Sequence, residues 1–234
     1  MSAPADADRR PGWGFGDVGV TLLLALLLAS VAAALATAVG PQSATGKAWA
    51  SVVLVVVPWL GLAGWPLWAA WHKGDGPVSD YRLRFTRPDV GWGVLGGLAA
   101  LVAGALVAAV VTALRGAPFG SAVGDVAAET TSASRGALVA LALTAVVGAP
   151  VVEELAFRGL FYGALEKFGQ PALWCVVWSS VAFAGFHFEL VRFPVLLAIG
   201  LVIGVVRWRT GSTGAAMVAH LTVNLPAAVA LATM

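Results

Sequence analysis

The hydrophobic residues of the chain are gathered in long, nearly uncharged runs that short polar segments separate. A helix needs about 20 mostly apolar residues to cross a bilayer, and about seven of the runs approach or exceed that length. They lie near 18–39, 48–71, 90–114, 136–166, 171–189, 193–207 and 213–233. The pattern therefore predicts an all-α, polytopic membrane helix bundle with about seven transmembrane helices, within a range of roughly six to eight.

Composition agrees with a membrane protein and excludes several other classes. The chain is 59% hydrophobic and 11% charged, whereas soluble domains carry about 25% charged residues. The formal net charge of +2 gives no reason to expect a nucleic-acid partner. The single cysteine, Cys175, excludes an internal disulfide framework and lies in an apolar run typical of a core position. We expect a multi-pass protein of the cell (plasma) membrane, with membrane lipid as its surroundings.

The chain divides into three parts by composition. Residues 1–16 are polar and rich in small residues, which predicts a disordered N-terminal tail. Residues 17–135 hold N-terminal transmembrane helices and loops, and residues 136–233 form a membrane core that carries the chemistry described below. Cytoplasmic loops of membrane proteins carry an excess of Lys and Arg, which predicts that the N-terminus lies inside. In that orientation the inside loops hold most of these residues, namely Arg9, Arg10, Lys73, Arg82, Arg84, Arg87, Lys167, Arg207 and Arg209.

Two adjacent acids and an arginine interrupt the fourth apolar run. Glu153 and Glu154 are followed by Arg158, although a charge at the bilayer centre costs roughly 2.5–3.5 kcal/mol. On a helix Glu154 and Arg158 share a face and can pair, whereas Glu153 points about 100° away. One acid is thus neutralised locally, and the other is left for chemistry. A structural ion pair between helices is the alternative interpretation.

Two further polar patterns fall in later spans. Phe183 precedes His187 by four residues, and His220 precedes Asn224 by four. At 1.5 Å per residue, Glu153 and His187 lie about 24 Å and 26 Å from the hairpin turn that joins their spans. The returning spans bring Asn224 within roughly 5 Å and His220 within about 10 Å of the same level. Each histidine alone is most simply a partner for a neighbouring helix, but the shared depth favours a common site.

Such a layer supports hydrolysis in two ways. Glu153 and His187 can hold a water and take its proton, because a carboxylate in a low-dielectric site can serve as a general base near neutral pH. His220 and Asn224 can then donate to the oxyanion, while the Glu154–Arg158 pair orients the site. Alternatively, Glu153, His187 and His220 form a ligand set for a divalent metal such as zinc. No HExxH motif is present.

These elements resemble, in their order, the CAAX-protease and bacteriocin-processing (CPBP, or Abi) family of intramembrane endopeptidases. That family carries EExxxR, FxxxH and HxxxN on successive membrane helices. The matching residues are Glu153, Glu154 and Arg158, then Phe183 and His187, then His220 and Asn224. The resemblance extends over about residues 136–230.

The resemblance implies an intramembrane endopeptidase that hydrolyses a peptide bond of a membrane-associated or prenylated-like peptide. It implies that Glu153 and His187 activate water and that His220 and Asn224 stabilise the oxyanion. The family is often named metalloprotease, and a metal-free glutamate mechanism is also proposed for it. A non-catalytic immunity or scaffold protein that binds a peptide in the same cavity is the alternative. A transporter is disfavoured, because the sequence shows no inverted repeat.

Overall fold

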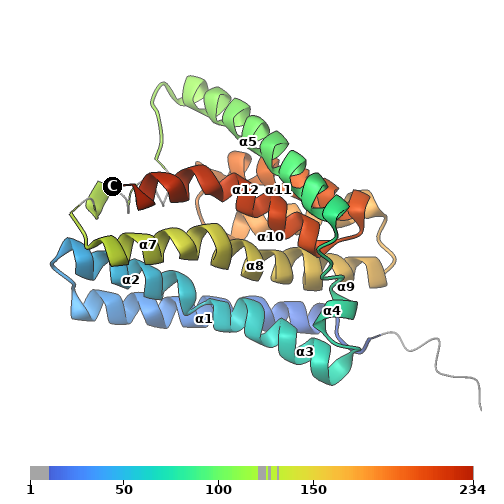
Figure 1. Ribbon diagram of the computed structural model, residues 1–234. Helices are drawn as coiled ribbons and strands as arrows, with labels where there is room; N and C mark the ends of the chain where they lie inside the picture. Colours follow the sequence, from blue (N-terminus) through green and yellow to red (C-terminus); the bar gives the residue numbers. More distant parts are fainter. Residues whose placement is uncertain (1–10, 121–124, 126–127, 131, 234) are drawn as a thin grey trace, which may run out of the picture.

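A computed structural model describes residues 11–120, 125, 128–130 and 132–233, and within these residues the regular structure is helical. Figure 1 shows the helices in stacked layers, with α1–α3 on one side, α7–α9 and α12 in the middle, and α5 across the other side. The first half of the chain forms α1 (Phe15–Val39), α2 (Ala44–Val56), η1 (Leu60–Gly64), α3 (Trp65–Lys73), α4 (Pro77–Asp80) and α5 (Arg87–Arg115). The second half forms α7 (Arg135–Leu143), η2 (Thr144–Gly148), α8 (Ala149–Glu154), η3 (Leu155–Phe161), α9 (Tyr162–Lys167), α10 (Ala172–Phe186), α11 (Phe193–Thr210) and α12 (Thr213–Ala232).

The described helices confirm the polytopic helical bundle. Six continuous helical segments are long and apolar enough to cross a membrane, and they cover 15–39, 44–73, 87–115, 135–167, 193–210 and 213–232. The seventh expected span corresponds to α10, which is apolar but has only 15 residues. At 1.5 Å per residue α10 is shorter than the hydrocarbon core of a bilayer, so it needs its neighbours to complete the crossing.

The N-terminal tail differs from the sequence prediction where the structure describes it. Residues 1–10 lie outside the described residues, but α1 begins at Phe15, inside the predicted tail. Trp13 is only 3% exposed, and its ring lies 5.3 Å from that of Tyr81. The Lys167 ammonium lies 4.1 Å above the same indole ring. Trp13 is therefore packed against the bundle, because an aromatic ring in a polar segment finds an apolar surface to cover.

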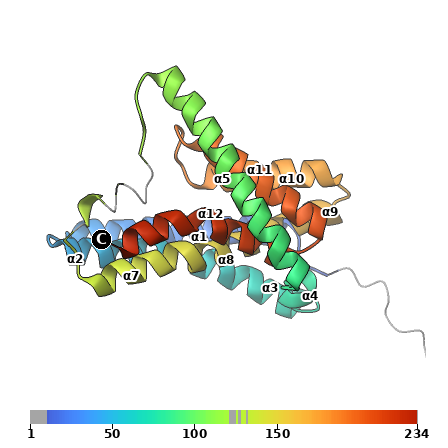
Figure 2. The same cartoon turned by 45° about the horizontal axis from the view of Figure 1, so that its top comes forward.

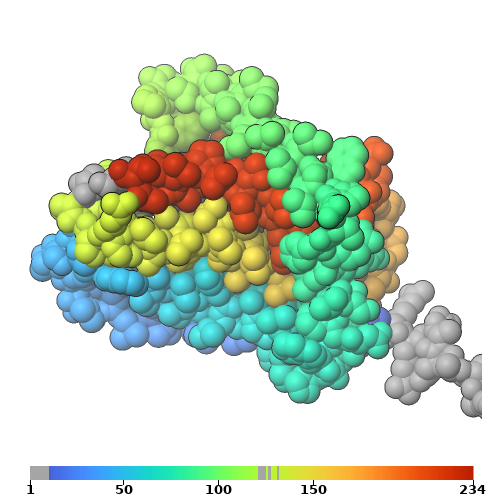
Figure 3. Space-filling view, in the orientation of Figure 1, coloured from blue at the N-terminus to red at the C-terminus, as the bar shows by residue number. Residues whose placement is uncertain are grey.

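Glycines let α5 pack closely on the helices that follow it. A Cβ atom at Gly97 would lie 2.5 Å from the Ala219 carbonyl oxygen of α12, and one at Gly93 would lie 2.7 Å from that of Ala215. Small residues at these positions therefore allow the two helix backbones to approach closely. Figure 2 shows α5 crossing α11 and α12, and in Figure 3 its C-terminal half stands away from the body.

The fourth span is one continuous helix that contains two wider, π-helical turns, η2 and η3. Pro150 follows η2 and has no backbone N–H to donate, which is a recognised cause of such turns. The α8 segment between the turns ends at Glu154, so both acids of the sequence motif lie between two breaks in the regular ladder. Such turns are frequent at functional sites, because they re-aim side chains.

Candidate active site

The Glu154–Arg158 pair predicted from the sequence is present and sealed from solvent. Nη1 of Arg158 donates to Oε1 of Glu154 across 3.1 Å, and both side chains are 0% exposed. Nη2 of Arg158 donates to the Gly200 carbonyl of α11 across 2.8 Å. The guanidinium carbon lies 4.7 Å from the centre of the Phe183 ring. The pair thus joins α8 and η3 to α10 and α11.

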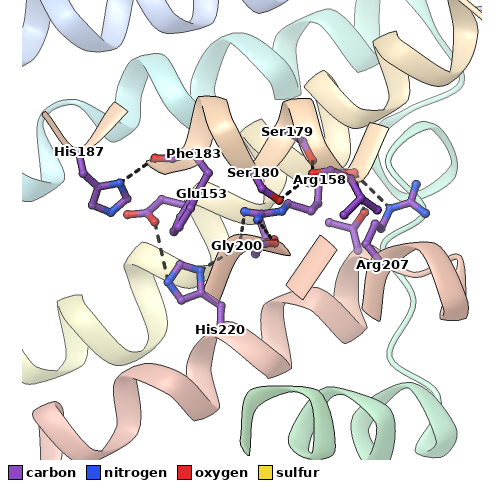
Figure 4. A network of polar contacts seen from close by, with 12 residues as sticks. Glu153, Arg158, Ser179, Ser180, Phe183, His187, Gly200, Arg207 and His220 are labelled. Carbon is purple, nitrogen blue, oxygen red and sulfur yellow. Dashed lines mark hydrogen bonds and ion pairs between the residues drawn. The ribbon is translucent and has the colours of Figure 1, made fainter. Parts of the chain in front are cut away.

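His220 of α12 faces both acids. Its Nδ1 donates to Oε1 of Glu154 across 2.9 Å, and its Nε2 lies 3.9 Å from Oε2 of Glu153. Figure 4 shows the Glu153 carboxylate pointing toward the His220 ring. The Glu153 side chain is 18% exposed, whereas that of Glu154 is 0% exposed. The two adjacent acids therefore differ in environment: Glu154 is a buried partner of Arg158 and His220, and Glu153 remains accessible.

Phe183 brings the two histidines of the motifs to one place. Its ring centre lies 4.8 Å from that of His187 and 5.5 Å from that of His220, in edge-on arrangements. Nδ1 of His187 lies 2.8 Å from the Phe183 carbonyl oxygen, one turn back on α10. Because a carbonyl only accepts, this nitrogen carries the proton, and Nε2 of the neutral ring is left as an acceptor. The four-residue spacing from Phe183 to His187 thus fixes the ring orientation as well as its depth.

Asn224 fills a gap that Pro150 creates in the fourth span. The Ala149 N–H donates to the Thr144 carbonyl, five residues back. The corresponding partner of the Ala145 carbonyl would be the nitrogen of Pro150, which has no hydrogen. Nδ2 of Asn224 donates to this Ala145 carbonyl across 2.9 Å instead. The described contact of Asn224 is therefore with η2, and a second N–H on the same amide nitrogen remains for a ligand.

A carbonyl of the η3 turn also has partners on other helices. The Tyr162 N–H donates to the Phe157 and Gly159 carbonyls, and the Arg158 carbonyl lies between them in the sequence. It accepts from Nε of Arg207 across 3.2 Å and lies 3.4 Å from the Thr213 hydroxyl. Arg207 is 1% exposed. Sequence reasoning assigned Arg207 to an inside loop, and the structure corrects this, because the helix α11 continues to Thr210 and turns the side chain inward.

The structure brings most of the motif residues into one cluster. Contacts join Glu153, Glu154, Arg158, Phe183, His187 and His220. The nearest imidazole to Glu153 among its described polar contacts is that of His220, whereas the sequence suggested His187. Which imidazole lies near Glu153 depends on the η3 turn and on the ion pair between Glu154 and Arg158. Residue spacing and depth along the helices do not specify it.

The metal-ligand set of Glu153, His187 and His220 has suitable residue types but not a ligand geometry. In the described part of the chain, no three His, Cys, Asp or Glu side chains are grouped closely enough to hold a metal ion. Nδ1 of His220 is held by Glu154 and Nδ1 of His187 by a backbone carbonyl, so each ring keeps its Nε2 atom for another partner. As they stand, the side chains are not grouped as metal ligands, and the proposal below uses side chains alone.

Fold and site together define a polytopic helical membrane protein whose core holds acids, an arginine and two imidazoles from separate helices. Residues 135–226 match the family model described as type II CAAX prenyl endopeptidase Rce1-like. The matched segment contains every motif residue, so the match confirms the resemblance to the CAAX-protease family. At the level of the family it supports an intramembrane endopeptidase. No curated protein and no solved structure matches the chain.

Proposed function

We propose that the protein is an intramembrane endopeptidase of the plasma membrane that hydrolyses a peptide bond of a membrane-associated or prenylated peptide. Glu153 is its general base. The observation that carries this assignment is the contrast between the two acids: Glu154 is fully buried and paired, and Glu153 is accessible and faces an imidazole. A carboxylate that served only to bridge helices would be paired like Glu154.

The hydrogen bonds of the two histidines support different roles for them. His187 donates from Nδ1 to a carbonyl, so its Nε2 can accept a hydrogen bond from the attacking water beside Glu153. His220 donates from Nδ1 to Glu154, so it supplies a donor from Nε2 when it is doubly protonated.

The reaction follows from these positions. The water oxygen attacks the scissile carbonyl carbon while its proton passes to Glu153. Nε2 of His220 and the second N–H of Asn224 donate to the oxyanion, and each such donor contributes about 3–4 kcal/mol in comparable sites. The C–N bond then breaks, and Glu153 returns the proton to the departing amine nitrogen. The products are an amine and a carboxylic acid, which then gives up its proton to the amine or to solvent, and no covalent intermediate with the protein forms.

The test is cleavage of labelled membrane peptides, with and without a farnesylated C-terminal cysteine, by purified protein in lipid nanodiscs. The wild-type protein is expected to cleave at least one of them. His187→Ala is expected to lower the rate by about 100-fold or more. His72→Ala is the matched control, because His72 is exposed and stacks on Trp68 away from the cluster.

Two outcomes would contradict the proposal. Folded wild-type protein that binds the peptides and cleaves none of them would favour the non-catalytic peptide-binding protein. Loss of cleavage in a chelator, with recovery on addition of zinc, would contradict the metal-free route. We expect cleavage to continue in the chelator.

A further inference from the structure

A groove separate from the active-site cluster runs between the N-terminal half of α5 and the C-terminal half of α11. It has a volume of about 820 Å³, within the range of roughly 300–1,000 Å³ that is usual for ligand sites. Its walls are apolar and come from Trp92, Leu95, Ala99, Val202 and Val205. Leu95 and Trp92 are each 60% exposed, so the groove opens outward from the bundle.

Cationic side chains stand at one end of the groove. Arg84 and Arg209 line it there, and the Arg84 side chain is 53% exposed. Its carboxylate neighbour, Asp89, is 4% exposed and accepts from the Thr86 hydroxyl across 2.7 Å and from the Thr86 N–H across 3.1 Å. The Asp89 carboxylate, which is the negative charge beside the groove, is therefore buried in the protein and not exposed in the groove. Arg84 lies 3.5 Å from Asp89, whose carboxylate partly compensates the charge of Arg84. Among the described residues Arg209 has no such carboxylate partner, so it supplies the uncompensated charge.

This end of the groove also has the features of a membrane interface. Trp92 and Trp208, which are 60% and 40% exposed, lie on the two helices near the arginines. Tryptophan is enriched where the acyl chains meet the headgroups. The distribution of Lys and Arg over the loops assigns the same end to the cytoplasm, whose leaflet carries the anionic lipids. Basic pockets between transmembrane helices at this level bind anionic headgroups.

We propose that this groove is a binding site for an anionic phospholipid. An acyl chain lies along the apolar walls, and the phosphate lies between Arg209 and Arg84. The site fixes the lipid by charge at one end and by shape along its length. The site also connects the lipid to α12, the helix that carries His220. Nη2 of Arg84 donates to the Thr210 carbonyl, and the Ser212 hydroxyl, just before α12 begins, donates to the Arg84 carbonyl.

The test counts lipids retained by the full-length protein in native mass spectrometry. Purified protein is given phosphatidylglycerol or phosphatidylcholine with identical acyl chains. Wild-type protein is expected to retain phosphatidylglycerol at least about fivefold more strongly, the factor that one lipid-facing arginine provides. Arg209→Glu is expected to abolish that preference. Arg115→Glu, which makes the same charge change at the exposed far end of α5, is expected to preserve it.

A second pair of variants tests the groove itself. Ala99→Phe fills the groove and is expected to lower retention of both lipids by about fivefold or more. Ala105→Phe adds the same ring at an exposed position of α5 outside the groove and is expected to change nothing. Equal retention of the two lipids by wild-type protein would overturn the proposal, as would undiminished retention by Ala99→Phe. Displacement of phosphatidylglycerol by a farnesylated peptide would reassign the groove to substrate. Because lipids are counted and not products, the test is independent of peptidase activity.

Discussion

The buried Glu154–Arg158 pair allows a sharp test of how the site is held together. Glu154→Gln changes the shape of the side chain very little but removes its charge. Arg158 then remains as a cation with 0% exposure, and the 3.1 Å contact between Nη1 and the carboxylate loses its ionic component. The amide oxygen can still accept from His220, so the main change is an uncompensated buried charge. Breaking a buried pair in this way costs about 3–5 kcal/mol.

The single cysteine offers a direct readout of unfolding. Cys175 is a free thiol with 0% exposure, so a thiol-reactive fluorophore labels it only when the bundle opens. For a chain of this size each kcal/mol corresponds to a shift in Tm of roughly 2–4 °C. Glu154→Gln is therefore expected to lower the labelling Tm by about 6–20 °C in detergent.

The double variant Glu154→Gln/Arg158→Met distinguishes a charge effect from a packing effect. Oε2 of Glu154 and Nε of Arg158 are buried without a hydrogen-bond partner among the described residues, so the pair is not optimised for stability. Removing both charges is expected to recover at least half of the Tm lost in the single variant. A double variant that is no more stable than Glu154→Gln, or a single variant within about 2 °C of wild type, would refute the reasoning.

Other variants test the packing around the site with the same thiol assay. Gly97→Val places a side chain against the α12 backbone, where a Cβ would lie 2.5 Å from a carbonyl oxygen, and should lower the free energy of unfolding by at least about 2 kcal/mol. Gly91→Val is the control and should be nearly neutral, because a Cβ there meets nothing within 4 Å. Equal effects of the two variants would argue against close α5–α12 packing. Asn224→Ala leaves the Ala145 carbonyl without its 2.9 Å donor and should lower the free energy of unfolding by about 1–3 kcal/mol. An unchanged Tm would show that this contact does not stabilise the protein. Arg207→Met removes a buried donor to the η3 turn and should both lower the Tm and slow peptide cleavage. Unchanged cleavage would show that this contact with η3 does not help to position the active site.

The helices and their order could be predicted from hydropathy, because lipid permits few alternatives to a helix for long apolar runs. The expected and observed spans agree closely, and the Glu154–Arg158 pair follows from spacing on a single helix. Local periodicity does not report contacts between helices. The bond from His220 to Glu154 therefore comes only from the packing of α12 against α8, although the motifs mark both residues.

The backbone irregularities explain the contacts that hydropathy and motif spacing do not predict. Pro150 stands at the start of the acidic motif, and its missing N–H is a readable signal for an unpaired carbonyl nearby. That signal predicts that a polar side chain from another span, such as Asn224, must supply the missing donor. No comparable signal marks Arg207, because its burial depends on where α11 ends and on its contact with the Arg158 carbonyl of η3.

Glu153, and not its buried neighbour, is the group that we expect to take the proton of the attacking water. The most direct measurement is the single-turnover cleavage rate of Glu153→Gln protein in nanodiscs, beside Glu189→Gln as control. Glu189 lies in the loop after α10, where its carboxylate pairs with Arg192 across 2.6 Å, outside the cluster. We expect Glu153→Gln to fall by about 100- to 10,000-fold with an unchanged Tm, and Glu189→Gln to stay within about twofold of wild type. Cleavage by folded Glu153→Gln protein at the wild-type rate would contradict the assignment of Glu153 as the general base.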